Sequence, residues 1–218
     1  MPANKETNAA TIWFVGIIAA LAMLAIGYLV FLSIHQTVAA QPKSTAFVKL
    51  LTPGGHGSGV HIGNGYIITA AHVADDFKDM TLKGSDGRSQ TATLLWQNVK
   101  YDVALMRASK PDELASVALD CSPNFLGQSV IAEGNPSDLE FVRAYGKVIG
   151  GVRPNAPNWL EAVPVNMAIV PGMSGGAVLN DDGKVVGISV GVMATPYGMA
   201  ALGYIVPATT ICMLLDRT

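Results

Sequence analysis

Ser174 lies in the segment PGMSGGAV, residues 171–178, and a serine set among glycines is a candidate nucleophile. A serine hydroxyl reacts only when a neighbouring base removes its proton, and histidine does this best near neutral pH. The pattern Gly-Xaa-Ser-Xaa-Gly also arises by chance in a chain with 23 glycines. Its meaning depends on whether the chain supplies a base and an orienting acid in a consistent order.

The positions of the histidines restrict the possible scaffolds. The chain has four of them, and all precede Ser174: His35, His56, His61 and His72. In α/β-hydrolases the same serine pattern occurs, but the catalytic histidine follows the serine. That class is therefore excluded.

His72 and Asp102 are the candidate base and acid. His72 follows the apolar run YIITAA, and Asp102 opens the run VALMRA further along the chain. A carboxylate there would accept the Nδ1–H of the imidazole, fix its tautomer and stabilise the imidazolium that forms during attack. Asp75 and Asp76 are alternative acids, but they lie too near His72 in sequence to reach its ring easily. The order His, Asp, Ser is the one that chymotrypsin-like proteases use.

The glycines beside the serine indicate an oxyanion hole. Attack on a carbonyl creates an oxyanion, and backbone N–H groups must point at it. The N–H groups of Gly172 and Ser174 are the expected pair, because a glycine two residues before the serine lets the backbone turn its amide inward.

Short apolar runs bounded by turn residues must position these groups. The runs are AFVKLL, GVHI, YIITA, ATLLW, VALMRA, SVIAEG, FVRAYGKVIG, WLEAVPV, AVLN, KVVGISVGV and ALGYIVP. Many short strands at this spacing favour a sandwich or barrel over alternating βαβ units. A polar seam at residues 110–124 divides them into two halves, and Pro207 favours a closing helix over 207–215.

Residues 11–34 form an uncharged apolar run of 24 residues. As a helix this run would be roughly 36 Å long, enough to cross a hydrocarbon core of about 30 Å. We expect a transmembrane helix that acts as a signal anchor, with a tail at 1–10 and a linker at 35–44. A buried helix of a soluble protein is the weaker alternative, because such helices rarely run this long without a charge.

A cleaved signal peptide is the stronger alternative to a retained anchor. Val38 and Ala40 have the spacing that signal peptidase uses, which would leave Gln41 as the new terminus. However, apolar regions of signal peptides usually span only about 7–15 residues and follow a basic leader, whereas Lys5 is offset by Glu6 here. The retained anchor is therefore favoured. The distribution of lysines does not decide the orientation.

Composition excludes some partners and leaves one pairing open. The chain of 218 residues has a formal net charge of −2, which gives no indication of a nucleic-acid partner. Cys121 and Cys212 could pair in an oxidising compartment or remain as two buried thiols. His56 and His61 are too few for a metal site, which needs three or four ligands, so neither a metal nor another cofactor is expected.

The motifs together resemble the trypsin-like serine protease superfamily, specifically its HtrA/DegP-like branch. The resemblance covers nearly all of residues 45–212. It is carried by GSGVHIGNGYIITAAHVAD, YDVALMRA, VIAEGNPSDLEFVRAYGKVIGGVRP, MAIVPGMSGGAVLNDDGKVVGISVGV and GYIVPATT.

The resemblance implies an all-β, chymotrypsin-like double β-barrel of two six-stranded antiparallel barrels over 45–218. Its lobes would span about 45–112 and 123–206, followed by the closing helix. It also implies endopeptidase activity on protein or peptide substrates, without a cofactor. The triad would be His72, Asp102 and Ser174, and the domain would lie outside the membrane on the extracytoplasmic side.

The sequence departs from this family at two points. Met173 precedes the serine where digestive proteases have an aspartate, which leaves open whether the oxyanion loop is latent. No C-terminal PDZ domain is recognised, so activation through one is not expected. The trimer of many relatives is not carried over, and the oligomeric state stays open.

Substrate-binding residues follow from position in the motifs. Ala168, six residues before the serine, would form the base of the S1 pocket, and with no acid there a preference for Lys or Arg is disfavoured. The strand of Ser189, Val190 and Gly191 would pair with the substrate, with Gly203 opposite. We expect a small or medium apolar side chain at the cleaved position.

Two other functions fit parts of the pattern. A catalytically latent protease fold could serve as a membrane-tethered binding module, although no damaged triad is visible. An esterase-like acyl transfer could use the same triad, but the run GISVGV, suited to pairing with an extended peptide, favours proteolysis.

Overall fold

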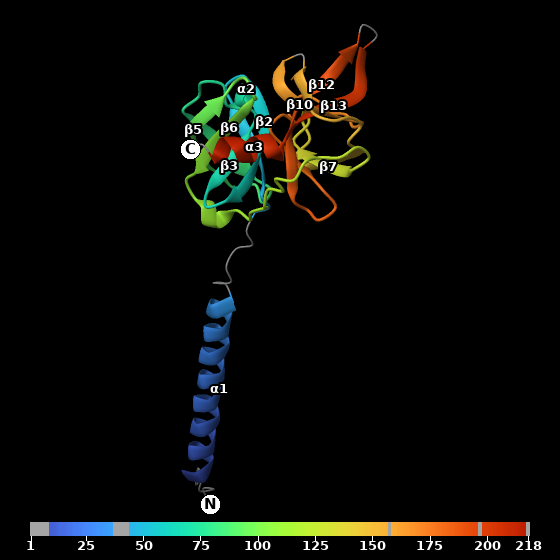
Figure 1. The fold of residues 1–218 in the computed structure, drawn as a ribbon. Helices are drawn as coiled ribbons and strands as arrows, with labels where there is room; N and C mark the ends of the chain where they lie inside the picture. The colour runs from blue at the N-terminus through green and yellow to red at the C-terminus, as the bar shows by residue number, and fades with distance from the viewer. Residues whose placement is uncertain (1–8, 37–43, 157, 196–197, 217–218) are drawn as a thin grey trace, which may run out of the picture. The chain divides into compact units, whose positions relative to one another are not determined.

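The computed structural model describes residues 9–36, 44–156, 158–195 and 198–216 (Figure 1). The chain divides into two compact units, residues 1–42 and 43–218. The expected tail at 1–10 and the expected linker at 35–44 lie largely outside the described residues.

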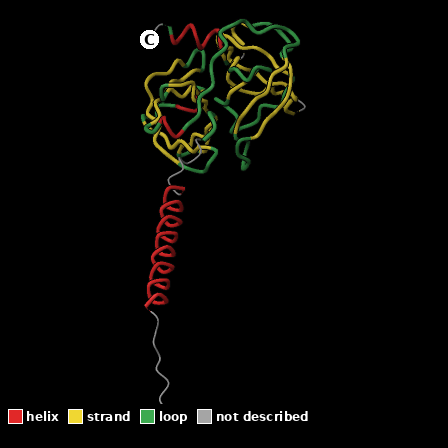
Figure 2. Tube along the Cα trace, turned by 90° about the horizontal axis from the view of Figure 1, so that it is seen from below, coloured by secondary structure: helices red, strands yellow, loops and turns green. Residues whose placement is uncertain are grey.

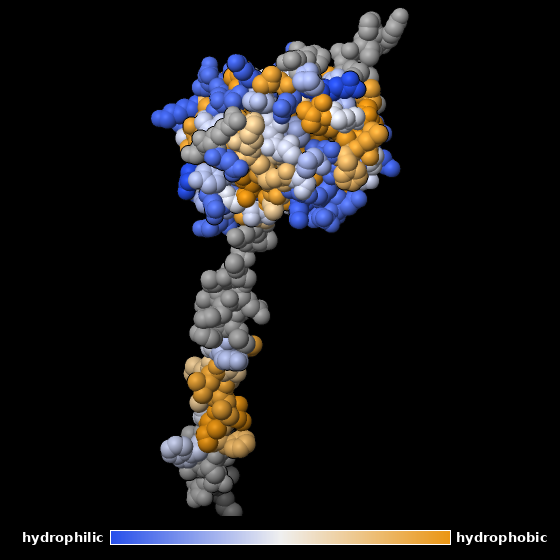
Figure 3. Space-filling view, viewed as in Figure 1, coloured by the Kyte–Doolittle hydropathy of each residue, from blue (hydrophilic) through white to orange (hydrophobic). Residues whose placement is uncertain are grey.

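The first unit contains one helix, α1, which spans Ala9–Gln36. Its described side chains are exposed, and large apolar ones such as Trp13, Ile17, Leu21 and Leu24 are among them (Figure 3). Within the described residues, none of the helices combines the length and the apolar character that a membrane crossing requires.

The first lobe of the second unit is a closed antiparallel barrel, in the order β1-β2-β3-β6-β5-β4. Its strands are β1 (Phe47–Thr52), β2 (Gly55–Gly63), β3 (Tyr66–Thr69), β4 (Asp79–Gly84), β5 (Ser89–Asn98) and β6 (Val103–Ala108). Apolar side chains alternate along β1 and β4, so one face of each strand lies in the core. This barrel confirms the all-β class and the six strands expected of the first lobe.

The second lobe is a seven-stranded antiparallel sheet, in the order β8-β7-β11-β12-β13-β10-β9. Its strands are β7 (Ser129–Gly134), β8 (Val142–Lys147), β9 (Arg153–Ala156), β10 (Trp159–Val165), β11 (Ala177–Leu179), β12 (Val185–Thr195) and β13 (Gly198–Pro207). The two lobes can be followed as separate groups of strands in the ribbon and in the tube view (Figures 1 and 2).

The second lobe differs from the six-stranded barrel that the resemblance implies. Strand β10 pairs with β13 only through residues 163–165, and its first half turns away to form a hairpin with β9. The sheet therefore gains a strand. A single bridge between Val148 and Val165 joins the β8 side of the sheet to β10.

Three short helical segments complete the described part of the domain. Helix α2 (Ala71–Ala74) follows β3, and the 3₁₀ helix η1 (Pro111–Glu113) opens the expected seam between the lobes. Helix α3 (Ala208–Leu215) begins directly after Pro207, in the place where the closing helix was expected. Cys121 and Cys212 form a disulfide, so the pairing that the sequence left open is made.

The apolar core has two parts. One part fills the first barrel and continues into second-lobe residues such as Ile188 and Val206 and into Ile211 and Leu214 of α3, so the last helix shares a core with the first strands. The other part fills the second lobe and includes Ile169, Met173 and Ile205. The segment 170–176, which carries the candidate nucleophile, is anchored in this second part through Met173.

Candidate active site

His72 projects from α2, the single turn that follows β3. The helix is anchored by Ala71 and Ala74, which are buried, while the His72 side chain is about half exposed. Strand β3 is paired on both sides, with β2 and β6, so the turn that carries the imidazole starts from a fixed position.

Asp102 holds His72 through both of its carboxylate oxygens. Oδ1 accepts the backbone N–H of His72 at 2.9 Å, and Oδ2 accepts its Nδ1–H at 2.8 Å. The second bond leaves Nε2 of the imidazole as the acceptor, which is the tautomer that a general base requires. Asp102 itself is 5% exposed and adopts a φ of +56°, a left-handed conformation that aspartate tolerates better than most residues.

The environment keeps Asp102 ionised. Burial acts to raise its pKa, but the hydrogen bonds and charge of His72, together with a hydrogen bond from Trp159, outweigh burial and lower the pKa below its usual value. The carboxylate therefore carries its negative charge at neutral pH, where it can stabilise an imidazolium. Asp75 and Asp76, the alternative acids, are not hydrogen-bonded to His72 among the described contacts.

Ser174 lies in a turn that two backbone hydrogen bonds tie to both lobes. Its carbonyl accepts the N–H of Ser58 from the first barrel at 2.8 Å, and the next residue, Gly175, donates to the carbonyl of Ser189 at 2.7 Å. Gly175 has a φ of +80°, and a Cβ there would lie 2.2 Å from Thr69 Oγ1. Only glycine fits at this point, because the turn passes directly against β3.

Gly172 turns the chain ahead of the serine. It has a φ of +94°, and its carbonyl accepts the hydroxyl of Ser58 at 2.7 Å. A Cβ at this position would lie 2.2 Å from the carbonyl oxygen of Asn135 and 2.7 Å from His56 Nε2. Among the described contacts, the N–H groups of Gly172 and Ser174 donate no hydrogen bond within the chain.

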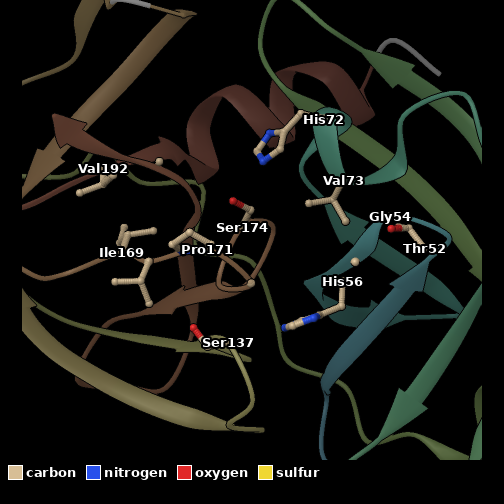
Figure 4. A pocket seen from close by; sticks show the side chains of 14 residues that line it. Thr52, Gly54, His56, His72, Val73, Ser137, Ile169, Pro171, Ser174 and Val192 are labelled. Carbon is tan, nitrogen blue, oxygen red and sulfur yellow. The ribbon is translucent and has the colours of Figure 1, made fainter. Parts of the chain in front are cut away.

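His72 and Ser174 face one cavity of about 530 Å³ (Figure 4). The imidazole points toward the serine side chain in this view. In the part of the chain that the structure describes, no hydrogen bond joins the Ser174 hydroxyl to His72. The opposite wall carries Ile169, Pro171 and Val192.

Met173 is buried in the second-lobe core at 2% exposure. Its N–H donates to the carbonyl of Val170 at 3.0 Å, and Gly134 lies so close that a Cβ there would meet the Met173 backbone at 3.0 Å. Where digestive proteases use a charged aspartate, this chain therefore anchors the loop by apolar packing. The sequence alone did not indicate this role.

The expected substrate-binding residues are divided by the structure. Gly191 lines the cavity beside Ser174, whereas Ala168 and Gly203 do not. The side chain of Ile169 lies against Gly203 instead, because a Cβ on Gly203 would be 2.6 Å from Ile169 Cδ1. Ile169, the neighbour of Ala168, lines the cavity in this stretch.

Ser189 and Val190 lie behind the cavity. Ser189 is fully buried, and its hydroxyl donates to the carbonyl of Met173 at 2.6 Å. It therefore holds the serine loop, the segment 170–176 that carries Ser174, in place. Val190 lines a neighbouring cavity of about 630 Å³, which it shares with Asp102 and Trp159.

The structure also adds residues that sequence reasoning did not single out. Ser58 and Asn135 link the lobes beneath the serine loop, and Trp159 reaches Asp102 from the second lobe. Among these, only the glycine-flanked GSG around Ser58 carried a local signal. His61 is structural: its Nδ1 bonds the carbonyl of Ala115 at 2.7 Å, and its Nε2 accepts the N–H of Gly65.

This geometry agrees with the comparisons to known proteins. The model of the trypsin-like peptidase domain family matches residues 57–188, more than half of the chain, and the chain belongs to that family. It is homologous to the periplasmic serine endoprotease DegP of Escherichia coli K12, with 31% identity over 166 residues. That match covers 74% of this chain but 35% of DegP, so the chain spans about a third of the length of this relative.

Solved structures support the fold. The HtrA-type protease AlgW with a tripeptide superposes with a TM-score of 0.69 at 22% identity, over 80% of this chain and 60% of that one. A mutant of Rv3671c from M. tuberculosis H37Rv in an inactive form superposes with a TM-score of 0.67 at 19% identity, over 79% of this chain and 85% of that one. The resemblance that the motifs indicated is confirmed.

Proposed function

We propose that the chain is a serine endopeptidase that cleaves peptide bonds through an acyl-enzyme on Ser174. The observation that carries the proposal is the Asp102–His72 pair, whose imidazole faces Ser174 across one cavity (Figure 4). Family membership supports the same activity.

In the proposed reaction, the Ser174 hydroxyl attacks the carbonyl carbon of the substrate and gives its proton to Nε2 of His72. The N–H groups of Gly172 and Ser174 receive the oxyanion, since neither donates to another group among the described contacts. His72 then gives its proton to the leaving amine, and a water molecule, activated by the same imidazole, hydrolyses the acyl-enzyme.

The proposed substrate is an extended segment of a protein or peptide. Gly191 on β12 lines the cavity and would pair with the substrate backbone, as an added strand pairs with a sheet edge. The side chain at the cleaved position would be small or medium and apolar, because Ile169 and Val192 border the cavity and no acidic residue is among its described lining residues.

Membrane attachment through residues 11–34 is a further part of the proposal. It rests on the uncharged run of 24 residues in the sequence. The family's periplasmic relatives favour an extracytoplasmic site for the protease domain. Extraction of membranes with alkaline carbonate, followed by N-terminal sequencing, distinguishes a retained anchor from a signal peptide cleaved before Gln41.

Labelling with a fluorophosphonate probe tests the proposed chemistry. The parent should react covalently at Ser174, whereas Ser174→Ala and His72→Ala should not be labelled. Ser122→Ala, which alters an exposed serine of the segment between the lobes, is the matched control and should be labelled like the parent. A folded parent that is not labelled would contradict the proposal and favour the latent binding module.

A further inference from the structure

Trp159 makes a contact with the candidate acid that the reaction described above does not use. It stands at the start of β10 in the second lobe, and its indole Nε1–H donates to Oδ2 of Asp102 at 2.9 Å. Asp102 belongs to the first lobe and is nearly fully buried. The bond therefore joins the two lobes at the carboxylate that orients His72.

The indole is held in place from several sides. Its ring packs directly on Gly191, where an added Cβ would lie 2.6 Å from Cη2 of the ring. The ring of Tyr204 lies at a centroid distance of 5.5 Å, and the next residue, Leu160, donates its N–H to the carbonyl of Lys100 in the first lobe at 2.8 Å. The N–H donor thus has little freedom to leave Asp102.

We infer that Trp159 is a positioning residue: it fixes the carboxylate of Asp102, and through it the imidazole of His72. This inference rests on the proposed peptidase function. Among the described contacts, Oδ1 of Asp102 has one donor, the N–H of His72, and Oδ2 has two, His72 Nδ1 and the indole. Without the indole, the carboxylate would keep only bonds to His72, and both groups could turn together.

The same ring connects the acid to the substrate strand. The Trp159 ring contacts Gly191 and also donates to Asp102. A substrate backbone paired with Gly191 would therefore lie next to the ring that holds the acid. Trp159 and Asp102 line the cavity of about 630 Å³ together with Asp75 and Asp76, which are the other carboxylates among its described lining residues.

Replacement of the indole by a phenyl ring separates the hydrogen bond from the packing. Trp159→Phe keeps an aromatic ring over Gly191 but removes the donor to Asp102. We expect kcat on a peptide substrate to fall about 10-fold with little change in KM, the size of effect of one hydrogen bond to a charged group. The acidic limb of the pH profile of kcat/KM should move to higher pH, because the carboxylate's charge is then shared with His72 alone.

Trp96→Phe is the matched control. Trp96 is a partly buried tryptophan of the first barrel whose Nε1 has no hydrogen-bond partner among the described residues. The same chemical change there should leave kcat and the pH profile within about twofold of the parent. A Trp159→Phe variant that behaves like this control would overturn the inference.

An NMR measurement decides the contact without any need for activity. The chain has three tryptophans, so three indole N–H signals are expected, and Trp159→Phe identifies the one from Trp159. The charge-removing, equal-sized change Asp102→Asn should move this signal upfield and leave that of Trp96 in place. A Trp159 signal that does not move on Asp102→Asn overturns the inference. If the signal moves but fluorophosphonate does not label the parent protein, only the proposed function is contradicted.

Discussion

The hydroxyl of Ser58 donates to the carbonyl of Gly172 at 2.7 Å, across the boundary between the two lobes. The same hydroxyl accepts the backbone N–H of Asn135 at 3.0 Å and its side-chain Nδ2–H at 2.9 Å. The buried Ser58 hydroxyl oxygen therefore fixes the Gly172 carbonyl, which lies in the chain between the two N–H groups of the proposed oxyanion hole. This carbonyl belongs to the peptide group that links Gly172 to Met173, so its hydrogen bond restrains the chain between the N–H groups of Gly172 and Ser174.

Ser58→Ala should lower kcat by more than its loss of folding stability explains. The change frees the Gly172 carbonyl and leaves two buried donors of Asn135 without their acceptor, which costs about 1–3 kcal/mol of stability. We expect kcat on a peptide substrate to fall about 10-fold or more. Thr69→Ala is the comparison, because its hydroxyl donates to the Ser58 carbonyl and not to the loop. Equal loss of kcat in the two variants would argue against a specific role of the Ser58 hydroxyl.

Gly172→Ala should abolish most activity. Its φ of +94° is strained for any side chain, and the added methyl would collide with the carbonyl oxygen of Asn135 at 2.2 Å. The loop must move, so the loss should approach the 10²–10³-fold in kcat that removal of an oxyanion-hole donor typically causes. Gly183→Ala is the control, because it has a φ of +73° in a turn with open space around its Cβ. It should cost stability and leave kcat unchanged; a comparable loss of kcat there would show that strain alone is responsible.

Glu133 should make the domain less stable as the pH rises. Burial raises its pKa above the usual value, and the hydrogen bond from Arg143 on β8 lowers it only in part. The stability that protonated Glu133 allows is fully present below the unfolded pKa of about 4.3, and it is lost as the pH rises through the folded pKa. Since the Arg143 side chain is 56% exposed and stays hydrated, Glu133→Gln should gain stability relative to the parent between pH 4 and pH 7.

The control for this prediction is Glu140, whose effect on stability depends on pH in the opposite direction. Hydrogen bonds from Lys83 and Lys49 lower the pKa of Glu140, so its contribution is present above the unfolded pKa and lost as the pH falls through the folded one. Urea unfolding of Glu133→Gln and Glu140→Gln at pH 4, 5.5 and 7 measures both trends. A stability difference for Glu133→Gln that shrinks toward pH 7 would contradict the burial argument.

Removal of the disulfide should destabilise the domain by about 2–4 kcal/mol. Cys121 and Cys212 are 91 residues apart, so their bond removes much conformational freedom from the unfolded chain. The double variant Cys121→Ser, Cys212→Ser should unfold at lower urea concentration than the oxidised parent. The parent treated with a reductant should match the variant, and a variant as stable as the oxidised parent would contradict the prediction.

The fold class could be predicted from local patterns because each strand carries its own alternation and its own turn residues. The first barrel follows this expectation. The hairpin of β9 and β10 does not, since nothing in WLEAVPV indicates that its first half leaves β13 for another partner. That departure places Trp159 beside Asp102, so a contact between residues 57 positions apart was beyond the reach of sequence patterns.

The candidate site shows the same division. His72, Asp102, Ser174 and the glycine at 172 stand in motifs whose chemistry can be recognised from residue type and order. Ile169 could not be distinguished from Ala168 by counting, because both residues lie in the irregular segment between β10 and β11. The burial of the Ser189 side chain on β12 likewise has no signal in the residue type. Met173 is informative only in three dimensions, where its neighbours in the second core become visible.

The inclusion of α3 in the first core bears on how this chain acquires its structure during synthesis. Ile211 and Leu214 belong to the same apolar cluster as Val48, so a ribosome has already made almost the whole domain before the last members of that cluster exist. Until then the cluster lacks these two apolar side chains, and Cys121 has no disulfide partner for the time needed to translate 91 residues. We expect nascent chains that stop before residue 208 to need a holdase or an oxidoreductase, and the domain to fold only once residues 208–215 have left the exit tunnel.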